Sequence, residues 1–549
     1  MMLCEQARRS AYAALTCVSL TALATGALAH DGGLTGKIGE ARFEVTCTPE
    51  AQATFNHAVA LLHSFWFTPA RKAFEDVAKQ DPSCAMAHWG VAMVARANPL
   101  ASAPTAKAMT EGLAAIERAQ SIGGKSQSER DYIEALAQFY RDYDKKDHRT
   151  RVVAHEQAME KLASTYPDDR EAAIFYALAL NIAASPADKT YGNQLRAGKL
   201  LEKVFVEQPQ HPGVAHYLIH TYDYPPIANQ GLDAAKRYAS IAPDSPHALH
   251  MPSHVFTRLG YWEESVSSNR TSAEVVKKEL ASSNPMLMGP EALHAQDYMV
   301  YAHLQLGQEA EAKRVLDEIR ARDNVDAGNH LAASYALAAI PARYALERHR
   351  WDEAARLEVP KVAGFSWSNF PQSEAVVHFA KGLGAAHTGD VAAAKASGER
   401  LKQLHDALVS MKQGYWAGQV GIQAKAVAAW TALAEGRKNE AVALMREAAD
   451  LESATDKHIV TPGHIVPARE LLGFMLLETG QPALALAEFE KSQAVEPNRF
   501  HGFAGAARAA ELAGAQEKAK AHYAKLLEVS AKADAERPEV KAARVVLNQ

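Results

Sequence analysis

The sequence contains 549 residues, of which 48% are hydrophobic and 22% are charged, and its formal net charge is -5 at pH 7. A chain of this length is too long for one compact core, so it indicates several domains or an extended array of repeats. Its hydrophobic content excludes a disordered chain, and its small negative charge gives no electrostatic basis for a nucleic-acid partner.

The N-terminal segment 1–29 has the pattern of an export signal. Arg8 and Arg9 precede an apolar stretch at 11–23, and the sequence Ala-Leu-Ala at 27–29 forms a small-x-small cleavage site before His30. We therefore expect a mature chain that begins near His30 and is periplasmic or otherwise exported. A membrane anchor is the alternative, although the stretch is short for spanning a bilayer. We expect no transmembrane segment after cleavage, because no later stretch has about 18 uninterrupted apolar residues.

Removal of the segment 1–29 would leave two cysteines, Cys47 and Cys84. Two cysteines in an exported protein favour a disulfide, and two free buried thiols are the alternative. If the first helical hairpin spans about 51–84, its first helix begins beside the point where its second helix ends. The two cysteines would lie at these adjoining ends. We therefore predict a disulfide between Cys47 and Cys84 that staples the first hairpin.

The sequence repeats the pattern of a tetratricopeptide (TPR) helical hairpin. In this pattern a small residue is followed four positions later by a large one, and a proline stops the second helix. The matching sets are Ala70, Phe74, Val77 and Pro82; Ala197, Leu201, Val204 and Pro209; Ala234, Tyr238, Ile241 and Pro246; Gly480, Ala485, Phe489, Ser492 and Pro497; and Gly514, Ala519, Tyr523 and Leu526. The last set follows the one before it by a single TPR period of about 34 residues. No segment keeps the alternation of a strand. The sequence therefore predicts an all-α, TPR-like solenoid of helical hairpins.

Irregular stretches interrupt the repeats, and the one from Pro360 to Pro371 suggests a division between two groups of hairpins. The expected organisation is a signal peptide at 1–29, an N-terminal segment at 30–50, an N-terminal array at 51–359 and a C-terminal array at 360–549.

Three segments carry a family resemblance: DPSCAMAHWG at 81–90, HPGVAHYLIH at 211–220 and HALHMPSHVF at 247–256. Shorter matches follow at 462–463, 467–470 and 537–539. Together they resemble an exported bacterial family of TPR-domain proteins whose function is poorly defined. The resemblance implies a TPR fold and export, and it supplies no activity, substrate or cofactor.

Four histidines form two pairs at helical spacing. His216 and His220 are four positions apart, as are His250 and His254, so each pair would lie on one face of a helix. The second pair follows the first by one TPR period, so equivalent helices of neighbouring hairpins would bring the pairs side by side on the concave surface. Four imidazoles there could hold a divalent transition metal such as zinc or copper.

Other side chains could complete this shell or orient the rings. They are His63, His247, His294, Asp223, Asp297, Glu291, Tyr217 and Tyr222.

Two other interpretations of the histidines stay open. Pro252 could kink the helix and misalign His250 with His254, so that the rings only shape the groove through bonds to tyrosines or carbonyls. Alternatively a neutral histidine beside a carboxylate could act as a general base, and the i,i+3 pairs His294 with Asp297 and His220 with Asp223 have that spacing.

The sequence thus predicts a binding or scaffold protein of the cell envelope, which holds a protein, a peptide or a small ligand on its concave face with a metal at the central histidines. The competing hypothesis is a metal-dependent enzyme, a hydrolase or an oxidoreductase, that uses the same cluster.

Overall fold

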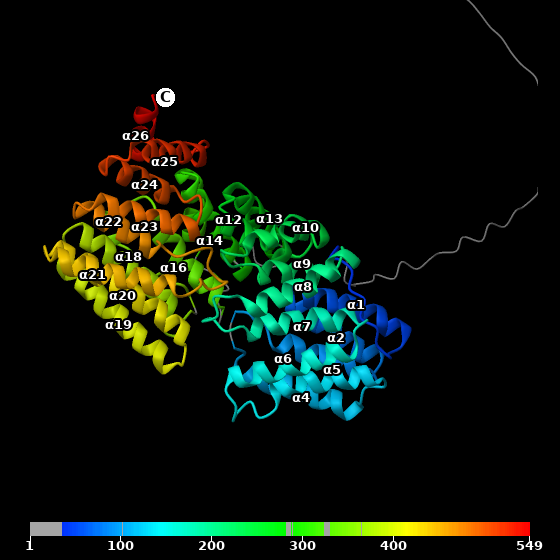
Figure 1. Ribbon diagram of the computed structural model, residues 1–549. Helices are drawn as coiled ribbons and strands as arrows, with labels where there is room; N and C mark the ends of the chain where they lie inside the picture. Colours follow the sequence, from blue (N-terminus) through cyan, green and yellow to red (C-terminus); the bar gives the residue numbers. More distant parts are fainter. Residues whose placement is uncertain are drawn as a thin grey trace, which may run out of the picture. The chain divides into compact units, whose positions relative to one another are not determined.

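The computed structural model describes residues 36–548 except 102, 282–286, 288, 323–324, 326–329 and 364. The predicted signal peptide and cleavage site lie outside these residues. The chain from Gly36 onward forms one compact unit, and the elements assigned in its described part are α-helices and two short 3-10 helices, η1 and η2 (Figure 1). The predicted all-α fold is confirmed.

The helices of the N-terminal half are α1 (Pro49–His63), α2 (Phe67–Gln80), α3 (Ala85–Ala95), α4 (Ala106–Ile122), α5 (Gln127–Tyr140), α6 (His148–Thr165), α7 (Arg170–Ala183), α8 (Gly192–Glu207), α9 (Pro212–Thr221), η1 (Ala228–Gly231), α10 (Leu232–Ile241), α11 (Pro246–His250), α12 (Pro252–Leu259) and α13 (Trp262–Ala281). Those of the C-terminal half are α14 (Pro290–Gln305), α15 (Glu309–Arg320), α16 (Leu331–Leu346), α17 (Trp351–Ala355), η2 (Trp367–Asn369), α18 (Pro371–His387), α19 (Val391–Ser410), α20 (Gly414–Ala434), α21 (Lys438–Ser453), α22 (Ala468–Glu478), α23 (Pro482–Val495), α24 (Phe500–Leu512), α25 (Gln516–Val529) and α26 (Pro538–Leu547).

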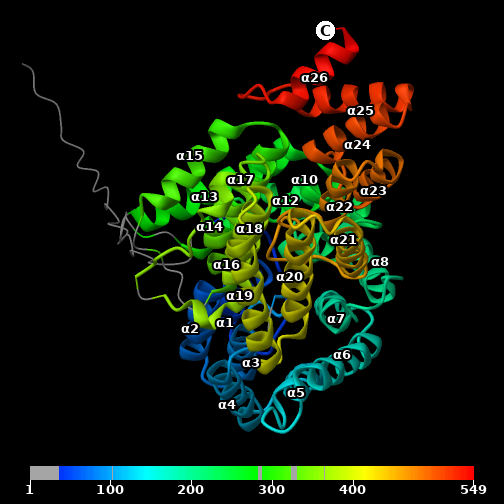
Figure 2. The same cartoon turned by 90° about the vertical axis from the view of Figure 1, so that its left-hand side faces the viewer.

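Helices that follow one another in the chain pack side by side, which gives a stack of helical hairpins (Figures 1 and 2). Alternate helices also contact each other: α1 with α3, α3 with α5, α7 with α9, α14 with α16, and α16 with α18. Contacts to the next helix and to the next but one are the pattern expected of repeats that each bury a face against their neighbours.

The residues of the predicted TPR pattern occupy the buried faces of the second helices. Phe74 of α2 and Phe489 of α23 are fully buried, as are the small residues four positions before them. Close packing requires glycine opposite the rings, because a Cβ atom at Gly90 would lie 2.2 Å from the Phe74 ring and one at Gly505 would lie 2.3 Å from the Phe489 ring. The TPR pattern of small and large residues therefore reflects the close packing of one hairpin against the next.

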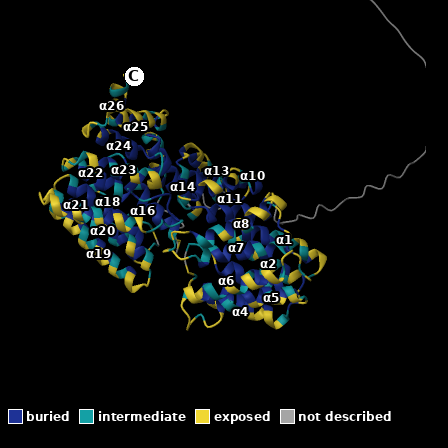
Figure 3. Cartoon of the chain, in the orientation of Figure 1, coloured by how far each residue is buried: buried dark blue, intermediate teal, exposed yellow. Residues whose placement is uncertain are grey.

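Buried residues gather where helices face each other, and exposed residues cover their outward faces (Figure 3). One hydrophobic core extends from Ile38 to Phe256, a second from Ala273 to Tyr344, and a third from Ala332 to Ala543. The division of the array at residue 360 stays a prediction. Within the described residues, no helix combines the length and the apolar character needed to cross a bilayer.

Cys47 and Cys84 form a disulfide, with Cα atoms 5.1 Å apart. Cys47 precedes α1, and Cys84 is the residue before α3 rather than the end of the second helix, because α2 already ends at Gln80. The bond therefore joins the starts of α1 and α3 and ties the first hairpin to the second. A hydrogen bond from the Thr48 backbone N–H to Asp81, at 3.0 Å, supports the same junction.

Replacement of both cysteines by serine is expected to destabilise α1 and α2 by about 3–4 kcal/mol, because the bond closes a loop across a sequence separation of 37. Hydrogen exchange of the amides in these two helices measures the loss. Reduction of the wild-type protein should reproduce it, and unchanged exchange in both samples would contradict a stabilising role.

Candidate metal centre

Six histidines from four helices come together inside the fold. His216 and His220 lie on α9, His247 and His250 on α11, His254 on α12 and His294 on α14. Their nitrogen atoms form two groups, and within each group the ligand atoms lie within 4.8 Å of one another. We call His216, His220 and His247 group A, and His250, His254 and His294 group B. The predicted pairs thus become neighbours, but the structure divides them between two groups, and His247 and His294 complete the groups.

Helix α9 places its two histidines in the interior because the helix is buried on every side. Pro212 occupies its first turn, and the ring of His211 caps it by accepting a hydrogen bond from the Val214 backbone N–H. His216 and His220 then point from one face, with ring centroids 4.9 Å apart.

Pro252 interrupts the helix that carries His250 and His254, as its sequence position suggested. Helix α11 ends at His250 and α12 begins at Pro252, but Met251 between them keeps helical angles of φ -53° and ψ -37°. The chain therefore keeps its direction. The Nε2 atoms of His250 and His254 lie 3.1 Å apart, so the expected misalignment does not occur.

The hydrogen bonds of group B determine which ring nitrogens carry protons. His254 Nδ1 donates to Asp223 at 2.9 Å, and His250 Nδ1 donates to Asn269 Oδ1 at 2.5 Å. The amide nitrogen of Asn269 donates to the Ser265 carbonyl, which directs Oδ1 toward His250. Because a neutral imidazole carries one N–H, both Nε2 atoms expose lone pairs to each other at 3.1 Å.

Two facing lone pairs repel unless a cation lies between them. Nitrogens bound to one zinc or copper ion at about 2.0–2.1 Å are separated by roughly 3.3 Å at the tetrahedral angle. The separation of 3.1 Å between the Nε2 atoms of His250 and His254 is close to this value. Their Nδ1 atoms are held by acceptors outside the group, as is usual for histidine ligands.

Group A repeats part of this arrangement. His216 Nδ1 donates to the His63 carbonyl at 2.6 Å, which leaves its Nε2 as an acceptor facing His247 Nε2 at 3.1 Å. His220 is buried, and neither of its ring nitrogens has a hydrogen-bond partner among the described residues. An unpartnered buried imidazole is costly unless it binds a ligand.

Burial keeps these histidines neutral. Removal from water lowers the pKa of every ring in the two groups, for His250 to about 3. Neighbouring histidines lower the pKa further for the rings other than His254, whose pKa is raised by Asp223 and lowered by Lys457 and Arg258. A neutral imidazole is the form that binds a metal.

Asp223 orients His254 and is itself held by two cations. Its carboxylate accepts from Arg258 Nε at 2.8 Å and from Lys457 Nζ at 3.3 Å. Burial alone would raise the pKa of Asp223, but Lys457, Arg258 and the bond to His254 hold it well below its usual range. The sequence suggested Asp223 but did not suggest Arg258, Lys457 or Asn269.

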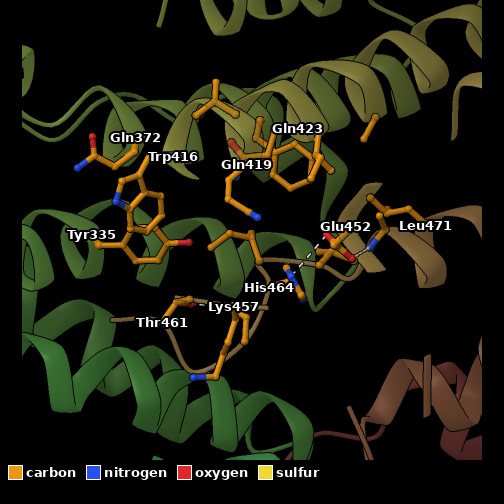
Figure 4. Close-up of a pocket in the computed structure, with 18 of the residues that line it drawn as sticks. Tyr335, Gln372, Trp416, Gln419, Gln423, Glu452, Lys457, Thr461, His464 and Leu471 are labelled. Atoms are coloured by element: carbon orange, nitrogen blue, oxygen red, sulfur yellow. Dashed lines mark hydrogen bonds and ion pairs between the residues drawn. The ribbon is translucent and has the colours of Figure 1, made fainter. Parts of the chain in front are cut away.

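A loop at 455–467, between α21 and α22, also reaches the histidines. In addition to the Lys457 contact, Tyr298 donates to the carbonyls of Ile459 and Thr461 at 3.2 and 3.3 Å. Figure 4 shows Lys457, Thr461 and His464 of this loop near Tyr335 and Trp416. Because the loop has no helical period, its position beside α9 and α14 could not be predicted from the sequence.

The two groups border a cavity of about 320 Å³. Its lining includes His220 and His247 of group A and His254 and His294 of group B. Glu291 and the apolar side chains Phe65, Phe67, Ile459 and Val460 form other parts of its wall. A small molecule in this cavity would therefore lie next to both groups.

The remaining predicted residues have other partners. His63 bonds to the Tyr217 hydroxyl at 3.0 Å and to Glu171 at 2.9 Å, and Glu171 also holds His211. Because the His63 carbonyl accepts the Nδ1 proton of His216, the contacts that fix His63 also help to hold His216 in place.

The predicted general-base pairs are replaced by other contacts. Asp297 pairs with Arg343 at 3.0 Å rather than with His294, and Asp223 bonds to His254 rather than to His220. Tyr222, which follows the last residue of α9, donates to Glu202 of α8 at 2.7 Å. The structure thus forms neither predicted pair, and it places the imidazole of His254 beside the carboxylate of Asp223 instead.

No protein-family model matches this chain, and no curated protein matches it. Among solved structures, it is similar to the Naa15/Naa10 complex bound to HypK-THB, with 12% sequence identity over 91% of this chain and 74% of that one. The TM-score is 0.23, and a match at this level assigns neither a family nor a function.

Proposed function

We propose that this protein is an exported helical-repeat protein that binds a transition-metal ion at its histidine groups and holds a small ligand in the adjoining cavity. The observation that carries the proposal is the contact between the Nε2 atoms of His250 and His254. Both atoms bear lone pairs and lie 3.1 Å apart, because Asp223 and Asn269 fix the protons on the opposite nitrogens.

The donor set supports zinc or copper. Imidazole nitrogens suit both metals, whereas magnesium and calcium require oxygen ligands. Asp223, the carboxylate that bonds to His254, is engaged with Arg258 and Lys457 and reaches the site only through the Nδ1 atom of His254.

The cavity favours a small ligand over a peptide or protein partner. Its volume of about 320 Å³ lies at the lower end of the range for small-molecule sites. The stacked hairpins serve as the scaffold that brings α9, α11, α12 and α14 together around it.

The proposal that the protein is exported is supported by separate observations. The charged, apolar and small-residue segments at 1–29 have the order of a secretion signal. A disulfide between Cys47 and Cys84 is typical of an oxidising compartment such as the periplasm. The resemblance to an exported bacterial TPR family agrees with this location.

Metal content tests the proposal directly. Untagged protein is loaded with Zn²⁺ or Cu²⁺, freed of excess ion by gel filtration and measured by elemental mass spectrometry. We expect bound metal in the wild type and a loss of group B occupancy in His250→Ala/His254→Ala.

The matched control is His378→Ala/His405→Ala, which removes two histidines of α18 and α19 that belong to neither group. This control should retain the wild-type metal content. Equal metal content in all three proteins, or none in the wild type, would refute the proposed site.

A metal-dependent enzyme is the second candidate, and the number of ligands favours it. Each group supplies three histidines, whereas closed structural zinc sites use four ligands and catalytic sites keep one position open. Addition of azide to the Co²⁺-loaded protein should change the visible absorption of an open site. A spectrum that azide leaves unchanged would exclude an open position.

A further inference from the structure

The two histidine groups are close neighbours. The ring centroids of His220 and His254 are 5.6 Å apart, and those of His247 and His250 are 6.2 Å apart. Because His220 and His247 belong to group A and His250 and His254 to group B, the groups meet along two ring contacts.

One ion cannot use both groups fully. Within each group two Nε2 atoms are 3.1 Å apart, a separation that fits two ligands of one ion, and all ligand atoms lie within 4.8 Å of one another. Among the described residues, the four histidines predicted from the sequence do not form one such set, because each pair belongs to a different group. Full occupancy of these donors therefore requires two ions.

His220 gives an independent indication of a ligand. The residue is 6% exposed and contributes to the cavity lining, and neither of its ring nitrogens has a hydrogen-bond partner within the described chain. It stacks against Phe65 and lies between His216 and His254. A metal in group A would satisfy one of its nitrogens.

We infer that the two groups form a dinuclear copper centre, with one ion bound by His216, His220 and His247 and the other by His250, His254 and His294. This inference rests on the proposed metal-binding function and extends it to the number and kind of ions. The cavity then offers its ligand two neighbouring ions, so the ligand class is a small molecule or anion that can bridge them.

The donors select copper over other metals. All six ligands are imidazoles, and copper binds nitrogen donors more tightly than the other divalent first-row ions. Among the carboxylates close to the groups, Asp223, Glu171 and Asp297 are engaged by cationic or histidine side chains, and Glu291 lies in the cavity wall. Two hard, oxygen-preferring ions would lack the carboxylate ligands that they need.

The experiment counts ions and unpaired spins. Wild-type protein loaded with Cu²⁺ should hold two copper ions per chain. His216→Ala/His247→Ala and His250→Ala/His254→Ala should each hold one, and the combination of all four substitutions should hold none. In electron paramagnetic resonance, each double variant should give the signal of one isolated Cu²⁺. The wild type should give fewer visible spins than copper ions, or lines split by the neighbouring ion.

His220→Ala is the variant least able to disturb the fold, because its ring has no hydrogen bond to lose within the described chain. It should lower the affinity for one of the two copper ions at least 10-fold and leave the affinity for the other unchanged. Circular dichroism establishes that each variant keeps the helical fold before its copper is counted.

The outcomes separate this inference from the proposed function. One ion in the wild type, lost in either double variant, would overturn the dinuclear centre and keep the metal-binding function. If the protein is offered both metals and binds two zinc ions but no copper, the choice of metal would be overturned. Two fully visible, unsplit copper signals would overturn the proximity of the ions, and no bound metal would overturn both proposals.

Discussion

Asp223→Ala is expected to lower the copper or zinc affinity of group B by about 10- to 100-fold, the usual cost of removing the residue that orients a histidine ligand. Asp223 accepts the Nδ1 proton of His254 at 2.9 Å, and this bond leaves Nε2 free for the metal. Without the acceptor, His254 can move its proton to Nε2 and turn its lone pair away from His250. Competition with a coloured chelator measures the affinity.

Asp223→Asn is the matched control, because the amide oxygen can still accept the His254 proton while the charge is removed. We expect it to lose less affinity than the alanine variant. Equal affinities in the wild type and the alanine variant would show that Asp223 does not position His254. Because Arg258 and Lys457 lose their counter-charge in both variants, a comparison of the two separates orientation from charge.

Arg499→Met is expected to destabilise the protein by about 3–5 kcal/mol, because it leaves two buried carboxylates without their cation. The guanidinium is fully buried and donates to Glu470 at 2.7 and 3.0 Å, to Glu347 at 2.7 Å and to the Tyr301 hydroxyl at 2.7 Å. It thereby joins α14, the residue that follows α16, and α22 at the start of α24. Thermal and urea unfolding measure the loss.

Arg508→Met is the control on the same helix. Arg508 is exposed and pairs with Glu511 at 2.9 Å, so its removal should cost no more than about 1 kcal/mol. Equal unfolding midpoints for the two variants would show that the buried cation is not needed.

The effect of Arg499→Met should also depend on pH. Burial raises the pKa of Glu470 to about 7 although Arg499 opposes the rise, and removal of Arg499 would raise it further. A carboxyl group with a raised folded-state pKa favours the folded state at low pH, and this contribution is lost as the pH rises. The difference between wild type and variant should therefore be smaller at pH 5 than at pH 8.

The parts of the fold that can be predicted from the sequence depend on local spacing. The small and large residues of the TPR pattern belong to one helix or to adjacent helices, so a contact such as Phe74 against Gly90 leaves a periodic trace. The histidine pairs are visible in the sequence for the same reason, because i,i+4 spacing and the interval of one repeat specify one helix face in neighbouring hairpins.

The parts that cannot be predicted in this way depend on contacts without a period. His294 follows His254 by more than one repeat, so the repeat interval does not lead to it. Lys457 meets Asp223 across a sequence separation of 234 and comes from a loop with no helical pattern. Asn269 and Arg258 are ordinary helix residues whose roles emerge only when their partners are in place. Cys84 lies outside its expected position because α2 ends at Gln80.

The loop at 455–467 would link maturation of the proposed metal centre to the C-terminal half of the chain. It supplies Lys457 to Asp223 and two carbonyl acceptors to Tyr298, and its Ile459 and Val460 form part of the cavity wall. Since a chain emerges from the ribosome from its N-terminus, the histidine helices exist well before this loop does. Loading of the proposed copper ions would then be a late event, completed only after the C-terminal helices have been synthesised and have folded back onto the earlier ones.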